Sequence, residues 1–142
     1  MTRPLRLVLV DDDALLLHGT ARALSQAGLT VASFCDARTA RIAVLRDPPD
    51  VLLTDFHMPG LDGVELARGV GVALGSRCPA IVLWTGSRAS IPARDVSLFD
   101  AVVDKPCRTP ELLDVLRSVG PGAGGVTESG VRGPTLARED VG

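Results

Sequence analysis

The sequence predicts an α/β fold in which a five-stranded parallel sheet is covered by helices on both faces. Short apolar, β-branched runs alternate strictly with helical patterns over the first 119 residues. The runs are continuously apolar, as in LVLV, which is typical of parallel strands buried on both faces. The alternation occurs five times. A closed barrel of the same units needs about eight of them, so we predict an open, doubly wound sheet.

The first helix has the clearest signals. Leu17, Ala21 and Leu24 share one face at helical spacing. Asp13 is placed to cap the start of this helix, and Gly28 follows its end. By the same reasoning we expect strands at residues 5–10, 30–34, 51–54, 80–84 and 101–103, and helices at 14–26, 37–46, 62–74 and 110–119.

Two helical segments carry weaker signals. Gly69 and Gly71 lower the helix propensity of the third helix. The fourth is a short helix expected between Ser87 and Leu98, where Pro92 interrupts the helical pattern.

The length of 142 residues fits one domain with a short extension. We assign residues 1–119 to the domain. Residues 120–142 hold 7 of the chain's 15 glycines and have no apolar periodicity. We predict that this segment is a flexible Gly/Pro-rich tail or linker.

Composition excludes several classes of function. The net charge of -2 and pI of about 5.6 argue against direct nucleic-acid binding by this segment and against attraction to anionic membranes. The apolar runs are too short to span a bilayer. Three widely spaced cysteines match no metal-ligand or redox motif and indicate reduced thiols. We therefore expect a cytoplasmic protein.

Polar residues follow four of the five expected strands. In sheets of this kind, ligands bind beyond the carboxyl ends of the strands, where the strand order reverses. With the order 2-1-3-4-5, the first and third strands are neighbours and their carboxylates meet. The residues at these ends are Asp11 and Asp12 after the first strand, Asp55 after the third, Thr85 after the fourth and Lys105 after the fifth.

These residue types suit phosphoryl transfer to a carboxylate. Three close carboxylates repel one another, and a hard divalent cation such as Mg²⁺ relieves that repulsion. A carboxylate can attack phosphorus and form an aspartyl phosphate. The metal and the Lys105 ammonium would neutralise charge on the phosphoryl oxygens, and Thr85 could donate a hydrogen bond to one of them.

The blocks VLVDDD, LLTDFHMPGLDG, IVLWTG and DKP, in that order, resemble the response-regulator receiver family of two-component signalling. The resemblance covers about residues 5–119 and implies a flavodoxin-like (βα)5 fold. It implies that Asp55 accepts a phosphoryl group from a histidine kinase, a histidine phosphotransfer protein or a small acyl phosphate. Such a protein assists its own phosphotransfer and is not a turnover enzyme.

The resemblance also implies roles for the surrounding residues. Asp11, Asp12, Asp55 and the backbone carbonyl of His57 would hold Mg²⁺. Thr85 would be the switch hydroxyl, and Lys105 would pair with the phosphoryl group. The output in this family passes through the surface of the fourth helix, fifth strand and fifth helix to a downstream effector domain or protein. Homodimerisation is left open.

The sequence departs from the family at the output side. Val102 stands three residues before Lys105, where the family usually has Tyr or Phe. Phe99 is nearby and offers a substitute in a different register. The phosphoacceptor chemistry is therefore intact in the sequence, whereas the form of the readout is unusual.

Two other functions fit parts of the pattern. A pseudo-receiver would act only as a protein-binding module. The set of Asp55, Lys105 and Thr85 argues against this alternative, while Val102 and the irregular fourth helix keep it open. A phosphatase resembling the haloacid-dehalogenase group would use Asp11 of Asp11-x-Asp13 as its nucleophile, but such enzymes normally have a longer chain with a cap. The acyl phosphate would then form on Asp11 instead of Asp55.

Other polar or aromatic residues have plainer interpretations. We expect Asp13 and Asp62 to cap helices and His18 to lie at the surface. Trp84 and Phe56 are expected to be packing residues, and Cys107 to be inert.

Overall fold

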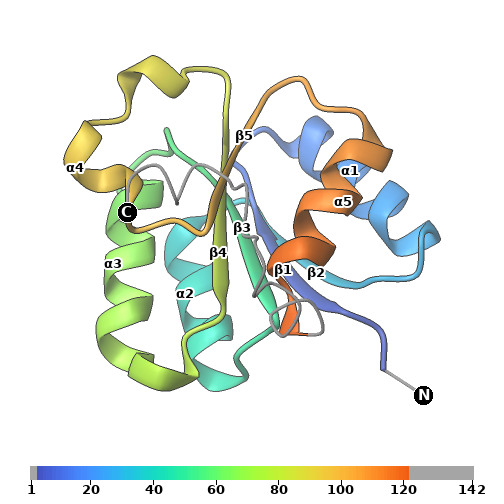
Figure 1. Ribbon diagram of the computed structural model, residues 1–142, viewed down its shortest axis with the longest axis horizontal. Coiled ribbons are helices and arrows are strands. Elements are labelled where there is room, and N and C mark those ends of the chain that lie inside the picture. The colour runs from blue at the N-terminus through green and yellow to red at the C-terminus, as the bar shows by residue number, and fades with distance from the viewer. Residues whose placement is uncertain (1–2, 122–142) are drawn as a thin grey trace.

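The structure, a computed structural model, describes residues 3–121 (Figure 1). Its strands are β1 Arg6–Val10, β2 Thr30–Phe34, β3 Val51–Asp55, β4 Ala80–Thr85 and β5 Ala101–Asp104. Its α-helices are α1 Ala14–Gln26, α2 Ala37–Arg46, α3 Gly63–Leu74, α4 Ala93–Val96 and α5 Thr109–Val119. Two single-turn 3₁₀ helices, η1 Gly75–Arg77 and η2 Arg88–Ser90, precede β4 and α4.

The five strands form one parallel sheet in the order β2-β1-β3-β4-β5. This confirms the predicted fold class and strand order. The chain moves outward from β1 in both directions, so the order reverses between β1 and β3. The register pairs Val10 with Thr54, so the residues that follow β1 lie beside the end of β3.

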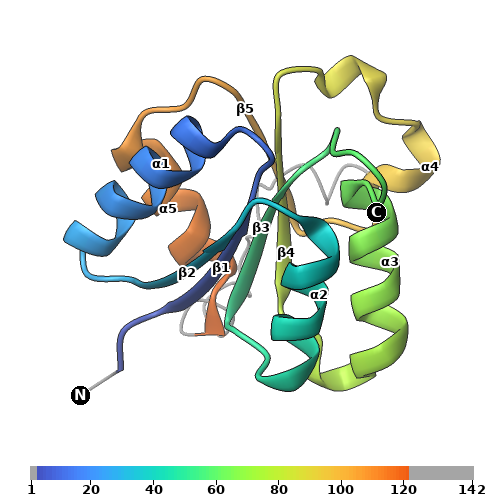
Figure 2. The ribbon, with the colours of Figure 1, turned by 180° about the vertical axis from the view of Figure 1, so that it is seen from behind.

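Helices cover both faces of the sheet. Helices α1 and α5 pack on one face, and α2, α3 and α4 on the other (Figures 1 and 2). Successive side chains of a strand point to opposite faces, so β1 contributes to two separate cores. Leu7 and Leu9 pack toward α1 and α5, while Val8 and Val10 pack toward α2 and α3. Each fully buried aliphatic side chain contributes about 2 kcal/mol to folding.

The expected elements agree with the structure to within about one residue at their ends. Leu17 and Leu24 of α1 are buried, and Gly28 adopts a positive φ of 105° just past the helix end. The segment before β5 differs from a regular helix most. It forms η2 and then a four-residue α4 that begins directly after Pro92. Proline fits at a helix start, where its missing N–H is not needed, so Pro92 precedes the helix instead of interrupting it.

An ion pair joins helix α4 to helix α3. Asp95 lies within α4 and is buried, and its carboxylate accepts from the guanidinium of Arg68 in α3 at 3.1 Å. Phe99, which follows α4, is 2% exposed and belongs to the core between the sheet and helices α2 and α3. It therefore lies inside the core and not on the surface of β5.

The tail predicted for residues 120–142 lies almost wholly outside the described residues. Within the described part, no helix is both long enough and apolar enough to cross a membrane.

Candidate functional site

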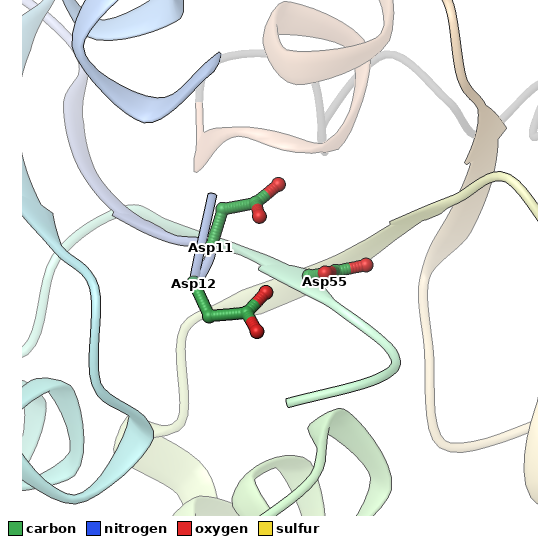
Figure 3. Close-up of side chains that lie close together, drawn as sticks. All are labelled: Asp11, Asp12 and Asp55. Carbon is green, nitrogen blue, oxygen red and sulfur yellow. The ribbon is translucent and has the colours of Figure 1, made fainter. Parts of the chain in front are cut away.

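Three carboxylates meet at the carboxyl ends of β1 and β3. Asp11 and Asp12 follow β1 directly, and Asp55 is the last residue of β3. Each offers an oxygen atom within 4.8 Å of the others. Figure 3 shows the three side chains extending to the same side of the strand ends. Asp11 is 1% exposed and Asp55 8%, whereas Asp12 is open to solvent. The structure thus brings together the three aspartates that the sequence indicated.

Lys105, the residue that follows β5, completes the cluster. Its ammonium lies 2.7 Å from Oδ2 of Asp11 and 3.3 Å from Oδ1 of Asp55. Its Nζ is also 4.9 Å from the centre of the Trp84 ring. The ammonium therefore bridges two carboxylates at the ends of different strands. Lys105 and Asp11 are 94 residues apart in the sequence.

The charge balance around Asp55 is unfavourable for its ionised form. Burial raises the pKa of the Asp55 carboxyl, and the neighbouring Asp11 carboxylate raises it further. Lys105 and the backbone N–H of Phe56, which donates to Asp55 Oδ1 at 2.8 Å, act in the opposite direction without cancelling the rise in pKa.

A divalent cation fits this arrangement. Hard cations such as Mg²⁺ bind carboxylate oxygens, and they favour the ionised form of a carboxyl whose pKa is raised by another negative charge. The donor set of Asp11, Asp12 and Asp55 is of the type that Mg²⁺ uses when it retains several waters.

The loop after β3 closes tightly on Asp55 through a glycine. The N–H of Gly63 donates to the carbonyl oxygen of Phe56 at 3.0 Å. A Cβ on Gly63 would clash with the carbonyl oxygen of Asp55 and lie 3.1 Å from the Cα of Phe56. Gly63 stands in the block LLTDFHMPGLDG, but the sequence did not reveal that the backbone of Asp55 leaves no room for a side chain at this position. The sequence signal that could have indicated this close approach is the glycine itself, a poor helix former at the first position of α3.

Thr85 and His57 lie at or just past the carboxyl ends of β4 and β3. Thr85 ends β4 and is buried, and its hydroxyl oxygen accepts from the N–H of Ser87 at 2.9 Å. Its carbonyl oxygen accepts from the N–H of Lys105 at 2.9 Å, which joins the ends of β4 and β5. His57 is exposed, and its ring lies edge-on to that of Phe56 at 4.5 Å between centroids. Its role as a carbonyl ligand stays a prediction.

The plainer interpretations are confirmed for several residues. Asp13 caps α1 by accepting from the N–H of Leu16, and Asp62 forms a capping box with Glu65 at the start of α3. His18 is exposed. Burial raises the pKa of the Cys107 thiol, which is the direction expected for an inert cysteine.

Arg88 lies over the position where the family usually has an aromatic residue. Its guanidinium donates to the backbone carbonyl of Val102 at 2.9 Å and to the carboxylate of Asp104 at 3.0 Å. Arg88 is the first residue of η2 and directly follows Ser87, whose N–H donates to the Thr85 hydroxyl. Arg88 could not be predicted from the sequence, because an arginine in a loop gives no local signal of a contact with a strand residue 14 positions later.

Comparison with known proteins identifies the family. Residues 7–117 match the family model of the response regulator receiver domain. The chain belongs to this family. Solved receiver domains have the same fold: that of Bermanella marisrubri superposes with a TM-score of 0.74 at 24% identity, covering 82% of this chain and 98% of that one. That of Methylobacillus flagellatus superposes with a TM-score of 0.75 at 18% identity, with coverage of 82% and 98%.

Curated relatives of this receiver domain are longer proteins. Response regulator MprA of Mycolicibacterium vanbaalenii is 34% identical over 119 residues, which cover 82% of this chain and 50% of the relative. The C4-dicarboxylate transport transcriptional regulatory protein DctD of Pseudomonas aeruginosa is 43% identical over 63 residues, 44% of this chain and 14% of that protein. This chain spans about half the length of the MprA proteins that it matches.

Proposed function

We propose that this receiver domain accepts a phosphoryl group on Asp55 in a Mg²⁺-dependent reaction and thereby switches its interactions with a partner or effector. The observation that carries the proposal is the position of the Lys105 ammonium, within 3.3 Å of Asp55 and 2.7 Å of Asp11. A nucleophilic carboxylate, further acidic groups for a cation and an ammonium form a complete set for phosphoryl transfer.

The two oxygens of Asp55 have different surroundings. Oδ1 accepts from Phe56 N–H and faces Lys105, while no residue in the described part hydrogen-bonds Oδ2. We therefore assign Oδ2 as the attacking atom. It would form a bond to phosphorus as the bond from phosphorus to the donor's nitrogen or oxygen breaks, with the electron pair leaving on the donor.

The remaining groups would stabilise the charge that develops on the phosphoryl oxygens. Lys105 would shift from Asp11 toward the phosphoryl group, and the Thr85 hydroxyl would donate a hydrogen bond to one phosphoryl oxygen. Asp11, Asp12, Asp55 and the His57 carbonyl would hold Mg²⁺, which supplies positive charge to the same oxygens when bound. The donor would be a histidine kinase or a histidine phosphotransfer protein.

We place the readout at η2, α4 and β5. A move of Thr85 toward the phosphoryl group would carry Ser87 and Arg88 with it, because Ser87 N–H is bonded to the Thr85 hydroxyl. Arg88 donates hydrogen bonds to the Val102 carbonyl and the Asp104 carboxylate. This motion would therefore reach the surface of β5 without an aromatic side chain. An effector domain or protein would bind the α4, β5 and α5 surface. We also propose a cytoplasmic location, supported by the three free cysteines.

The phosphatase alternative is disfavoured by the surroundings of Asp11. One oxygen of Asp11 accepts from the N–H of Asp13, and the other is held by Lys105. Asp13 in turn caps α1 and is not available as a general acid. The pseudo-receiver alternative is disfavoured because two further carboxylates, Asp11 and Asp12, and the Lys105 ammonium lie around Asp55.

Phosphorylation is tested by incubating the protein with Mg²⁺ and acetyl phosphate. We expect a phosphoryl mass gain that is labile to base and to hydroxylamine and requires Mg²⁺, because the product is an acyl phosphate. Asp55→Asn should abolish the gain, whereas Asp114→Asn, an exposed change on α5, should leave it intact. Peptide mapping that located the label on Asp11 would support the phosphatase. No gain with any donor would support the pseudo-receiver.

A further inference from the structure

Trp84 lies on the same side of the sheet as the charged cluster. It belongs to β4 and pairs in register with Asp55 of β3 on one side and Val103 of β5 on the other. Its side chain is 3% exposed and packs in the core under α1 and α5. Alternation along the strands directs Asp11, Asp55 and Lys105 to that same side, since the residues two positions earlier, Leu9, Leu53 and Val103, belong to that core.

The ammonium of Lys105 has three neighbours, of which two are carboxylates and the third is the Trp84 ring. Nζ lies over this ring at 4.9 Å from its centre. A cation within about 6 Å of an indole face is attracted by the negative charge density of that face, more strongly when the pair is shielded from water. Lys105 is the only lysine of the chain and Trp84 the only tryptophan.

A cavity lies next to the contact. It has a volume of about 360 Å³ and opens between α1 and α5. Lys105 and Trp84 both line it, together with Leu16, Thr20 and Leu112. The lysine stem is flexible and is not enclosed by packed side chains where it borders this cavity. The Trp84 ring, in contrast, is held in place by its burial in the core. It therefore limits the directions that the ammonium can take.

We propose that Trp84 is a positioning residue for Lys105, holding the ammonium at the level of the carboxylates so that it reaches the phosphoryl group on Asp55. This inference rests on the proposed function and adds a residue to it. Asp11 alone would draw the ammonium toward β1 and away from Asp55. The Trp84 ring lies in register with Asp55 and would keep the ammonium between Asp11 after β1 and Asp55 at the end of β3.

The contact itself is tested without any measurement of phosphorylation. Protein labelled with ¹³C-lysine gives one side-chain spin system, that of Lys105. Its ε-methylene protons should resonate upfield of free lysine, because they lie near the face of an aromatic ring. Trp84→Leu should remove this upfield shift and Trp84→Phe should retain part of it. Lysine resonances at the free-lysine position in the wild type would overturn the proposal.

The role in the reaction is tested by a double-mutant cycle on the rate of phosphorylation by acetyl phosphate. Trp84→Leu should lower the rate about fivefold, the loss expected for one partly shielded cation–π contact. Trp84→Phe should restore most of it. In a Lys105→Met background, Trp84→Leu should have no further effect, because Trp84 acts through Lys105. Equal losses in both backgrounds would overturn the proposal.

A matched core variant separates positioning from loss of packing. Val82→Ala removes apolar volume from the same strand and the same core, two residues before Trp84, without touching Lys105. We expect it to lower stability while leaving the phosphorylation rate within about twofold of the wild type. A fivefold loss in Val82→Ala as well would overturn the proposal.

An intact upfield shift in a protein that takes no phosphoryl group would overturn the proposed function, and the role of Trp84 with it. Phosphorylation without the shift would overturn the role of Trp84 alone.

Discussion

Gly63→Ala is expected to destabilise the protein by about 3 kcal/mol and to slow phosphorylation of Asp55 about 100-fold. The added methyl group would clash with the carbonyl oxygen of Asp55. It also lies 3.1 Å from the Cα of Phe56, so relief requires movement of the backbone and not of a flexible side chain. That backbone carries the phosphoacceptor, and small displacements of a reacting group cost large factors in rate.

Gly71→Ala is the matched control for this substitution. Gly71 lies in the same helix, α3, and a Cβ there would meet nothing within 4 Å. Replacement of glycine by alanine in a helix stabilises by about 0.5–1 kcal/mol when no clash results. Urea denaturation of the two variants should therefore show shifts of opposite sign. A Gly63→Ala protein as stable as the wild type would show that the loop after β3 yields easily, contrary to the close packing on Asp55.

Asp55→Asn is expected to stabilise the protein in the absence of divalent cations, by about 1 kcal/mol at pH 7, or roughly 4 °C in Tm. The reason is the raised pKa of the Asp55 carboxyl, caused first by burial and then by the Asp11 carboxylate. An amide avoids both costs. Thermal unfolding in EDTA measures the difference, and Asp114→Asn serves as the control because Asp114 is exposed on α5.

The pH dependence of this difference has a defined sign. Between the usual pKa of 3.8 and the raised value, the folded wild type binds more protons at Asp55 than the unfolded chain does. The contribution of Asp55 to stability therefore falls as pH rises through this window. The advantage of Asp55→Asn should be greatest above the raised pKa and shrink toward pH 4. An advantage that grew toward pH 4, or an Asp55→Asn protein less stable than wild type at pH 7, would show that the attraction of Lys105 for Asp55 dominates.

Mg²⁺ is expected to reverse the ranking. At a concentration tenfold above its dissociation constant, a ligand of the folded state stabilises by about 1.4 kcal/mol. The wild type should gain this amount, while Asp55→Asn should gain much less because one of its three carboxylates is lost. Equal gains in both proteins would place the cation elsewhere.

The fold could be predicted largely from the sequence, because the apolar runs of a parallel sheet are local. Each strand is a short, continuous run, and each helix has its own cap or spacing, as Asp13 and Leu17 show for α1. The segment before β5 was harder. Its shape depends on Asp95 pairing with Arg68 of α3 and on the burial of Phe99, and neither is encoded in local spacing.

The sequence by itself determined the residue types at the strand ends and the edge of the sheet at which they gather. Parallel strands all end at one edge, so Asp11, Asp12 and Asp55 had to lie near one another once the strand order was known. Only the tertiary structure decided where the remaining groups point. The Lys105 ammonium lies between Asp11, Asp55 and the Trp84 ring, and Gly63 lies so close to the carbonyl of Asp55 that a Cβ there would clash with it. These contacts join different segments, and they depend on side-chain rotamers and loop paths that packing selects after the strands have assembled.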